Sequence, residues 1–229
     1  MSIELVVFDI AGTTVADHGE IALAFQSALA NFGYHIPVEK INPLMGYKKP
    51  EAIKRMLMEF EGDSGKITGD YIESIHRKFV DIMVDHYRTT DELQALPFAE
   101  EIFEYLHSNS IKIGLDTGFS KEITDVIIDR LGWLRDKKID CYVCSDEVEQ
   151  GRPYPFMITN IMERLNITDA STVIKVGDTE VDVNEGLNAG CKYSIAVTTG
   201  AFSEDDLKPY NPSYIINSLE ELIPIIEKG

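Results

Sequence analysis

LVVFDIAGTT (residues 5–14) places a carboxylate, Asp9, at the end of a short apolar run and before a turn of small residues. The same order recurs at residues 111–118 (IKIGLDTG), where Thr117 follows the apolar run, and at residues 173–182 (VIKVGDTEVD). Short apolar runs that are bounded by turn signals are typical of buried strands. Open α/β sheets bind ligands at the carboxyl ends of their parallel strands. These stretches therefore predict one site at which their polar ends meet.

Strands and helices alternate in the second part of the chain. Strands that alternate with helices of this length are typical of βαβ units, and hence of a parallel sheet that is covered by helices on both faces. We expect the strand at residues 5–9 to join this sheet, because its end carries matching chemistry. The predicted fold class is α/β, with a Rossmann-like parallel-sheet core. The other expected strands are 111–116, 139–144, 172–177, 192–197 and 214–217, and the expected helices are 98–109, 120–131, 154–165, 180–189 and 218–227.

The segment between the first strand and this alternating part reads almost entirely as helix. Apolar residues recur there at helical spacing, which is typical of core or helix–helix contacts. We therefore expect an all-helical cap domain at residues 17–91, inserted into an α/β core formed by residues 1–16 and 92–229. Its apolar stripes could also support a homodimer through the cap. The helical runs cover residues 21–33, 50–61 and 71–87.

Composition excludes several classes of partner. The 229-residue chain has a formal charge of −18, which disfavours a broad contact with nucleic acid. No apolar run approaches the roughly 20 residues needed to cross a bilayer, and the first residues lack the features of a signal peptide. Cys141 and Cys144 lie three apart in an expected strand, so they are better interpreted as free thiols than as a zinc or redox pair. We expect a cytoplasmic protein without a membrane or nucleic-acid partner.

Clustered carboxylates predict a metal ion at the site. If the sheet is as expected, Asp9, Asp178 and Asp182 converge, and they repel one another unless a cation lies among them. Hard oxygen ligands beside an anionic substrate favour Mg²⁺, and the backbone carbonyl of Ala11 could be a further ligand. One oxygen of Asp9 would then hold the metal while the other attacks phosphorus and forms an aspartyl-phosphate. The simpler alternative is that these aspartates only cap turns and helices.

Three further groups could bind the oxygens of a phosphoryl group. Thr117 would contribute its hydroxyl and Gly118 its backbone N–H. Arg152, in the GRPYP loop at residues 151–155, would supply a fixed positive charge just before the helix expected from Tyr154, whose N-terminus adds a favourable partial charge. A lone arginine in such a loop is otherwise usually solvated. We favour the functional interpretation because all the pieces recur in order.

These pieces resemble, in their order, the four motifs of the haloacid dehalogenase superfamily. The similarity is greater to one branch, phosphonatase (phosphonoacetaldehyde hydrolase) and the phosphonatase-like hydrolases. That branch has alanine two residues after the nucleophile, as at Ala11, and arginine in a Gly-Arg-Pro-Tyr-Pro loop, as at Arg152. It also has a cap segment Met-Gly-x-x-Lys, which residues 45–49 (MGYKK) match. The resemblance covers nearly the whole chain.

The resemblance implies cleavage of a carbon–phosphorus bond. Lys49 would condense with a substrate aldehyde, and the resulting iminium would accept the electrons that a bare carbanion could not hold; Met45 and Gly46 would bind the substrate. Lys49 must be neutral to attack, and we expect the start of the following helix and the adjacent Lys48 to lower its pKa. The alternative is that both lysines form a solvated cap surface. Ala11 replaces the aspartate that commonly protonates the leaving oxygen in phosphate-ester hydrolysis.

Three positions depart from the branch. Ala52 replaces a histidine, Phe119 replaces a tyrosine, and no cysteine occurs at residues 19–20. Three functions therefore stay open. The first is a Mg²⁺-dependent hydrolase of an aldehyde phosphonate. The second is a phosphomonoesterase that acts on a small phosphorylated metabolite without the usual second aspartate. The third is a catalytically weak protein that binds such a metabolite.

Overall fold

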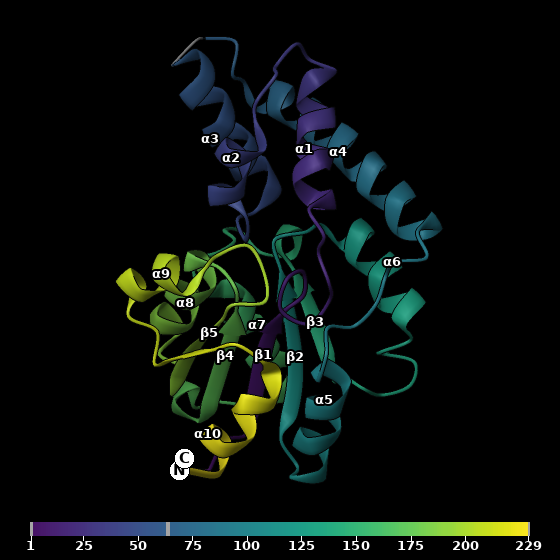
Figure 1. Cartoon of the computed structure of the whole chain (residues 1–229). Coiled ribbons are helices and arrows are strands. Elements are labelled where there is room, and N and C mark those ends of the chain that lie inside the picture. The colour runs from purple at the N-terminus through teal and green to yellow at the C-terminus, as the bar shows by residue number, and fades with distance from the viewer. Residues whose placement is uncertain (1, 63–64, 229) are drawn as a thin grey trace.

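A six-stranded parallel sheet forms the centre of the molecule, with strand order β3-β2-β1-β4-β5-β6 (Figure 1). The computed structural model describes residues 2–62 and 65–228. The α/β prediction is confirmed, and each expected strand is present within a few residues of its expected bounds. The strands are β1 (Leu5–Asp9), β2 (Lys112–Thr117), β3 (Cys141–Cys144), β4 (Val173–Gly177), β5 (Tyr193–Val197) and β6 (Tyr214–Ile216).

The first strand is apolar throughout because it is buried on both faces. Val6 and Phe8 pack into the larger core, to which α5 and α6 contribute, whereas Leu5 and Val7 pack against α7 in a second core. Alternate residues of a strand point to opposite faces, so one apolar run serves both cores. The helices around the sheet are α5 (Ala99–Ser108), α6 (Lys121–Leu131), α7 (Phe156–Leu165), α8 (Glu180–Ala189), α9 (Glu204–Leu207) and α10 (Leu222–Lys228).

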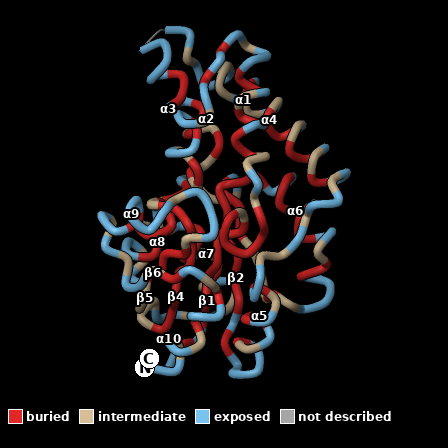
Figure 2. Tube along the Cα trace, in the orientation of Figure 1, coloured by how far each residue is buried: buried red, intermediate tan, exposed pale blue. Residues whose placement is uncertain are grey.

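Four helices stand above the carboxyl edge of the sheet (Figure 1). In Figure 2, many of the buried residues of these helices, drawn in red, lie on the sides that face the other helices and the core below them. Stacked rings of Phe25 and Phe79, with centroids 4.3 Å apart, hold two of them together. We call these four the cap helices; their assignment to a separate domain stays a prediction, as does a homodimer through them. They are α1 (Glu20–Ala30), α2 (Val38–Ile41), α3 (Lys49–Glu61) and α4 (Gly69–Thr89).

The two chain segments that lead into and out of the cap helices run side by side. Ala16 N–H donates to the Gln94 carbonyl at 3.2 Å, and Leu96 N–H donates to the Thr14 carbonyl at 2.9 Å. The bridge between Val15 and Ala95 is antiparallel. Sequence periodicity could not predict this pairing, because it involves single residues rather than a strand.

Several helix ends differ from their predicted positions for local reasons. α7 begins at Phe156 rather than Tyr154, because residues 151–154 form a turn in which Tyr154 N–H donates to the Gly151 carbonyl at 3.2 Å. α10 begins at Leu222, after a short 3-10 turn. The unpredicted α9 is a single turn whose start is capped by Ser203.

The cysteines and the helices bear on two further predictions, about a metal or redox pair and about a membrane crossing. Cys141, Cys144 and Cys191 are all free, with Cys144 buried and Cys141 half-buried; the interpretation of the Cys141–Cys144 pair as simple thiols rather than a zinc or redox site stays a prediction. In the described ranges, no helix combines the length and apolar character that a membrane crossing requires.

Candidate active site

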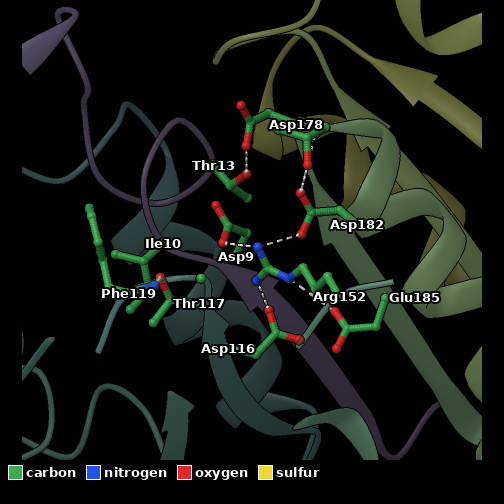
Figure 3. A network of polar contacts seen from close by, with 12 residues as sticks. Asp9, Ile10, Thr13, Asp116, Thr117, Phe119, Arg152, Asp178, Asp182 and Glu185 are labelled. Carbon is green, nitrogen blue, oxygen red and sulfur yellow. Dashed lines mark hydrogen bonds and ion pairs between the residues drawn. The ribbon is translucent and has the colours of Figure 1, made fainter. Parts of the chain in front are cut away.

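The predicted site residues meet at the carboxyl ends of β1, β2 and β4, where Figure 3 shows Asp9, Thr117, Arg152, Asp178 and Asp182. One cavity between the sheet and the cap helices is lined by nearly all of them. The cavity-lining residues that the sequence predicted are Asp9, Ala11, Met45, Gly46, Lys49, Thr117, Gly118, Arg152 and Asp178. Asp182, the remaining predicted metal ligand, does not line it but lies directly behind.

Asp9 and Arg152 form an ion pair at the floor of the cavity. Asp9 Oδ1 lies 2.7 Å from Arg152 Nη1, and the Asp9 residue is only 5% exposed. Burial raises the pKa of Asp9 to about 6, although the Arg152 guanidinium acts in the opposite direction. The other carboxylate oxygen of Asp9 points away from Arg152 (Figure 3). Asp9 therefore has one oxygen held and one oxygen free for chemistry.

Asp9, Asp178 and Asp182 form a cluster with the composition of a site for a hard cation. One carboxylate oxygen from each lies within 4.8 Å of the others. Thr13 Oγ1 donates to Asp178 Oδ1 at 3.1 Å, and the Ala201 N–H donates to Asp178 Oδ2 at 2.7 Å. Burial and the charges of Asp9 and Asp182 hold the pKa of Asp178 well above its usual range. A divalent cation with oxygen ligands would relieve this repulsion, so the residues present fit such an ion.

A network of buried charges that the sequence analysis did not predict lies beneath the site. Lys175 Nζ contacts Asp116 and lies 3.1 Å from Asp182 Oδ1 and 3.3 Å from Glu185 Oε2. Arg152 contacts Asp116 as well, and its Nε donates to Glu185 Oε2 at 3.1 Å (Figure 3). All of these side chains are fully buried. The carboxylates around Arg152 thus number four, with Asp9 included.

The strand register explains why these groups meet. Asp116 pairs with Asp9, and Lys175 pairs with Val7, so all three polar side chains point to the face of the sheet that α7 and α8 cover. Glu185 follows Asp182 by three residues and therefore lies on the same side of α8. The available signal was Lys175 itself, because a lysine inside a central strand must find carboxylate partners.

Lys49 is buried in the wall of the cavity that the cap helices form. It is the first residue of α3 and is 4% exposed. Its Nζ lies 4.9 Å from the ring centroid of Phe119 and 5.6 Å from that of Phe25. Burial lowers the pKa of Lys49 to about 8, whereas the negative charge of Asp9 acts in the opposite direction. The shift has the predicted direction, but burial is its main cause.

The alternative that Lys48 and Lys49 form a solvated surface is wrong. Lys49 is enclosed, and the half-buried Lys48 donates from Nζ to the Val148 carbonyl at 3.1 Å. Lys48 therefore joins the segment before α3 to the loop that follows β3.

The loop before α3 closes directly onto the end of β2. A Cβ atom at Gly118 would lie 2.7 Å from the Gly46 carbonyl oxygen, and still closer to the Tyr47 carbonyl oxygen. Only glycine permits this approach. Tyr47 also donates from its hydroxyl to Glu180 Oε1 at 2.7 Å, at the start of α8. These contacts place Met45 and Gly46 against the same cavity as Thr117.

Known proteins are similar to this chain over most of its length. The family model for haloacid dehalogenase-like hydrolases matches residues 6–197. A phosphonoacetaldehyde hydrolase of Latilactobacillus sakei is 33% identical over 82% of this chain and 73% of its own length. One of Bacillus cytotoxicus is 29% identical over the whole chain and 88% of its own length. A bifunctional phosphonoacetaldehyde hydrolase/aminoethylphosphonate transaminase of Clostridioides difficile is 34% identical over 87% of this chain, which corresponds to only 32% of that protein.

Solved structures share the fold. A phosphonoacetaldehyde hydrolase-like protein from Oleispira antarctica superposes with a TM-score of 0.84 at 23% identity, covering all of this chain and 92% of that one. A hydrolase from Pseudomonas syringae gives a TM-score of 0.86 at 17% identity, with 98% of each chain covered. At these identities the likeness establishes the architecture alone.

Proposed function

Because this chain belongs to the haloacid dehalogenase-like hydrolase family and is therefore a hydrolase, we propose that it cleaves the carbon–phosphorus bond of an aldehyde phosphonate, of which phosphonoacetaldehyde is the simplest probe. The observation that carries the proposal is the buried amine of Lys49 in the same cavity as Asp9. An amine with a lowered pKa is suited to imine formation, and a carboxylate is suited to attack on phosphorus. The names of the relatives support this assignment.

Lys49 would prepare the substrate for bond cleavage. Its neutral amine attacks the aldehyde carbon, and loss of water leaves an iminium joined to the lysine. The rings of Phe25 and Phe119 would stabilise this cation, as they now flank the Lys49 Nζ. The electron pair of the carbon–phosphorus bond then moves towards the iminium and forms an enamine. The enamine takes up a proton on carbon, and water releases the aldehyde product from Lys49.

Asp9 would receive the phosphoryl group. Its free oxygen bonds to phosphorus as the carbon–phosphorus bond breaks, which gives an aspartyl-phosphate that water later hydrolyses to phosphate. Arg152 holds the other oxygen at 2.7 Å and so orients the carboxylate. The Thr117 hydroxyl and the Gly118 N–H would bind the phosphoryl oxygens from the end of β2.

Magnesium would be held by Asp9, Asp178 and the Ala11 carbonyl. Asp182, whose carboxylate belongs to the same cluster but does not line the cavity, would be a further ligand. When bound, the ion supplies positive charge that offsets the charge of the phosphonate and of the carboxylates. Asp9 would remain the nucleophile, and Arg152 would still orient its carboxylate.

Borohydride trapping with phosphonoacetaldehyde tests the proposal. We expect reduction during turnover to add the substrate-derived two-carbon fragment to Lys49, located by peptide mass spectrometry. Lys49→Met should abolish both trapping and phosphate release. Lys54→Met is the matched control, because Lys54 is exposed on the same helix. A Lys49→Met enzyme that releases phosphate at the unchanged rate would overturn the proposal.

The same experiment separates the two other functions. Hydrolysis of phosphate esters at equal rates by the parent protein and Lys49→Met, without any trapped adduct, would indicate a phosphomonoesterase. Tight binding of a phosphorylated metabolite without phosphate release would indicate the weakly catalytic, binding function.

A further inference from the structure

Asp17 is a carboxylate in the cavity to which the proposed function gives no task. It lies on the segment that leads into the cap helices and lines the same cavity as Asp9 and Lys49. Its side chain is half-buried, and Asp17 Oδ1 accepts a hydrogen bond of 3.0 Å from the Gly19 N–H. That bond fixes the carboxyl group beside the cavity.

The surroundings of Asp17 favour a carboxyl group that holds a proton. The charge of Glu20 acts on the Asp17 carboxyl group three residues before it. Burial and the charge of Glu20 raise the pKa of Asp17. Glu20 also accepts from the His18 N–H at 2.6 Å, and its Oε1 lies 4.0 Å from His86 Nε2.

Two more groups lie near these acids. The charge of Asp17 acts on the Lys49 amine, and both residues line the same cavity. The buried hydroxyl of Tyr87, from α4, lies within electrostatic reach of Asp17 and Glu20, and no hydrogen-bond partner is found for it in the described part of the chain.

Imine formation needs a group that gives and takes protons, and the cavity offers few. Among the described residues that line it there is no histidine, cysteine or tyrosine. Phe119 presents a ring without a hydroxyl, and Asp9 and Lys49 are already committed as nucleophiles. Asp178 is held by Thr13 and Ala201 within the predicted metal cluster. Of the described carboxyl groups that line the cavity, Asp17 is therefore the one without another role.

We propose that Asp17 is a further catalytic residue, the proton donor and acceptor for formation of the Lys49 imine. This inference rests on the proposed function. The Lys49 nitrogen bonds to the aldehyde carbon while the carbonyl π electrons move to oxygen, which takes the proton of Asp17. The Asp17 carboxylate then removes a proton from the attached nitrogen. Asp17 returns that proton to the hydroxyl, which leaves as water while the nitrogen lone pair forms the iminium.

Asp17→Asn tests the inference because asparagine keeps the acceptor for the Gly19 N–H but cannot exchange a proton. With phosphonoacetaldehyde, we expect the rate of borohydride-trapped adduct formation and the rate of phosphate release each to fall by about 100-fold or more. Hydrolysis of 4-nitrophenyl phosphate, whose leaving group needs neither imine nor acid, should stay unchanged. Asp91→Asn is the control, since Asp91 is exposed on the other connecting segment. Thermal unfolding midpoints check that each variant folds.

The possible results distinguish a failure of the role of Asp17 from a failure of the proposed function on which it rests. Normal adduct formation in Asp17→Asn, with Lys49 trapped in the parent protein, overturns the role of Asp17 and leaves the proposed function intact. Equal losses of adduct formation and of 4-nitrophenyl phosphate hydrolysis, or a lowered unfolding midpoint, indicate a merely structural role and also overturn it. If the parent protein forms no adduct at all, both the function and this inference fall.

Discussion

Arg152 Nη1 lies 2.7 Å from Asp9 Oδ1, and the same guanidinium contacts three further buried carboxylates. A charge with that many partners cannot be removed without leaving several anions uncompensated. We predict that Arg152→Met lowers the free energy of unfolding by about 3–5 kcal/mol, as expected when one partner of a buried ion pair is removed. Urea denaturation measures this difference. Arg164→Met is the control, because its partly exposed pair with Glu147 at 3.1 Å is worth at most about 1 kcal/mol.

Lys175 provides the second cation of the network, and its contribution can be isolated from that of its partners. Lys175→Met alone should destabilise the protein by about 3–5 kcal/mol, because Asp116 and Glu185 lose a contact in a fully buried place. Combining it with Glu185→Gln also replaces a carboxyl group that Lys175 contacts, so the double variant should lose less than the sum of the single losses. A double-mutant cycle in urea measures the coupling. Strict additivity would show that Lys175 and Glu185 do not interact.

The strands and the main site residues could be predicted because their signals are local. β1 and β4 are buried on both faces and therefore read as apolar runs, and each run ends in the polar residue that lines or adjoins the cavity. Parallel strands end at one edge, so the meeting of Asp9, Thr117 and Asp178 follows once the sheet is recognised.

The buried network and Asp17 could not be predicted in the same way. Lys175 finds Asp116, which lies 59 residues away in the chain, and no local pattern names that partner. Asp17 precedes a helix and reads as an ordinary turn residue, so only the fold of the segment that carries it shows that it lines the same cavity as Lys49. The start of α7 was predicted two residues early because the GRPYP loop forms a turn first.

Lys49 should make the protein less stable than it would be without the amine. Its pKa is about 8 in the folded protein against the usual value of 10.5, so protonation opposes folding below pH 8. We predict that Lys49→Met raises the free energy of unfolding at pH 7, by up to about 3 kcal/mol from the size of the shift. Between pH 8 and pH 10.5 the unfolded chain binds a proton that the folded chain does not, so the parent protein should gain stability with rising pH and approach the variant. Urea denaturation at pH 7 and pH 10 checks both statements.

The same pKa predicts how imine formation depends on pH. The amine of Lys49 becomes neutral as the pH rises through about 8, whereas the proposed proton donor Asp17 loses its proton as the pH rises, so the rate of borohydride-trapped adduct formation should be highest at an intermediate pH and lower on either side. Single-turnover trapping from pH 6 to pH 9.5 measures the profile. The exposed Lys54→Met control should show the same curve, and a rate that is flat across this range would contradict a titrating Lys49.

Substitution of Asp178 tests the metal cluster. Its carboxylate should destabilise the folded protein without metal and stabilise it when Mg²⁺ is bound. Without metal, the folded protein holds the pKa of Asp178 well above its usual range, so its carboxylate opposes folding at neutral pH, and this cost diminishes as the pH falls. Asp178→Asn should therefore unfold at a higher temperature than the parent protein in EDTA. With Mg²⁺ at about 100 times its dissociation constant, the parent protein should gain about 2.7 kcal/mol, whereas the variant should gain much less because a ligand is lost. Calorimetry with and without Mg²⁺ measures both effects. An equal response of the two proteins to Mg²⁺ would show that the ion, if it binds, does so away from Asp178.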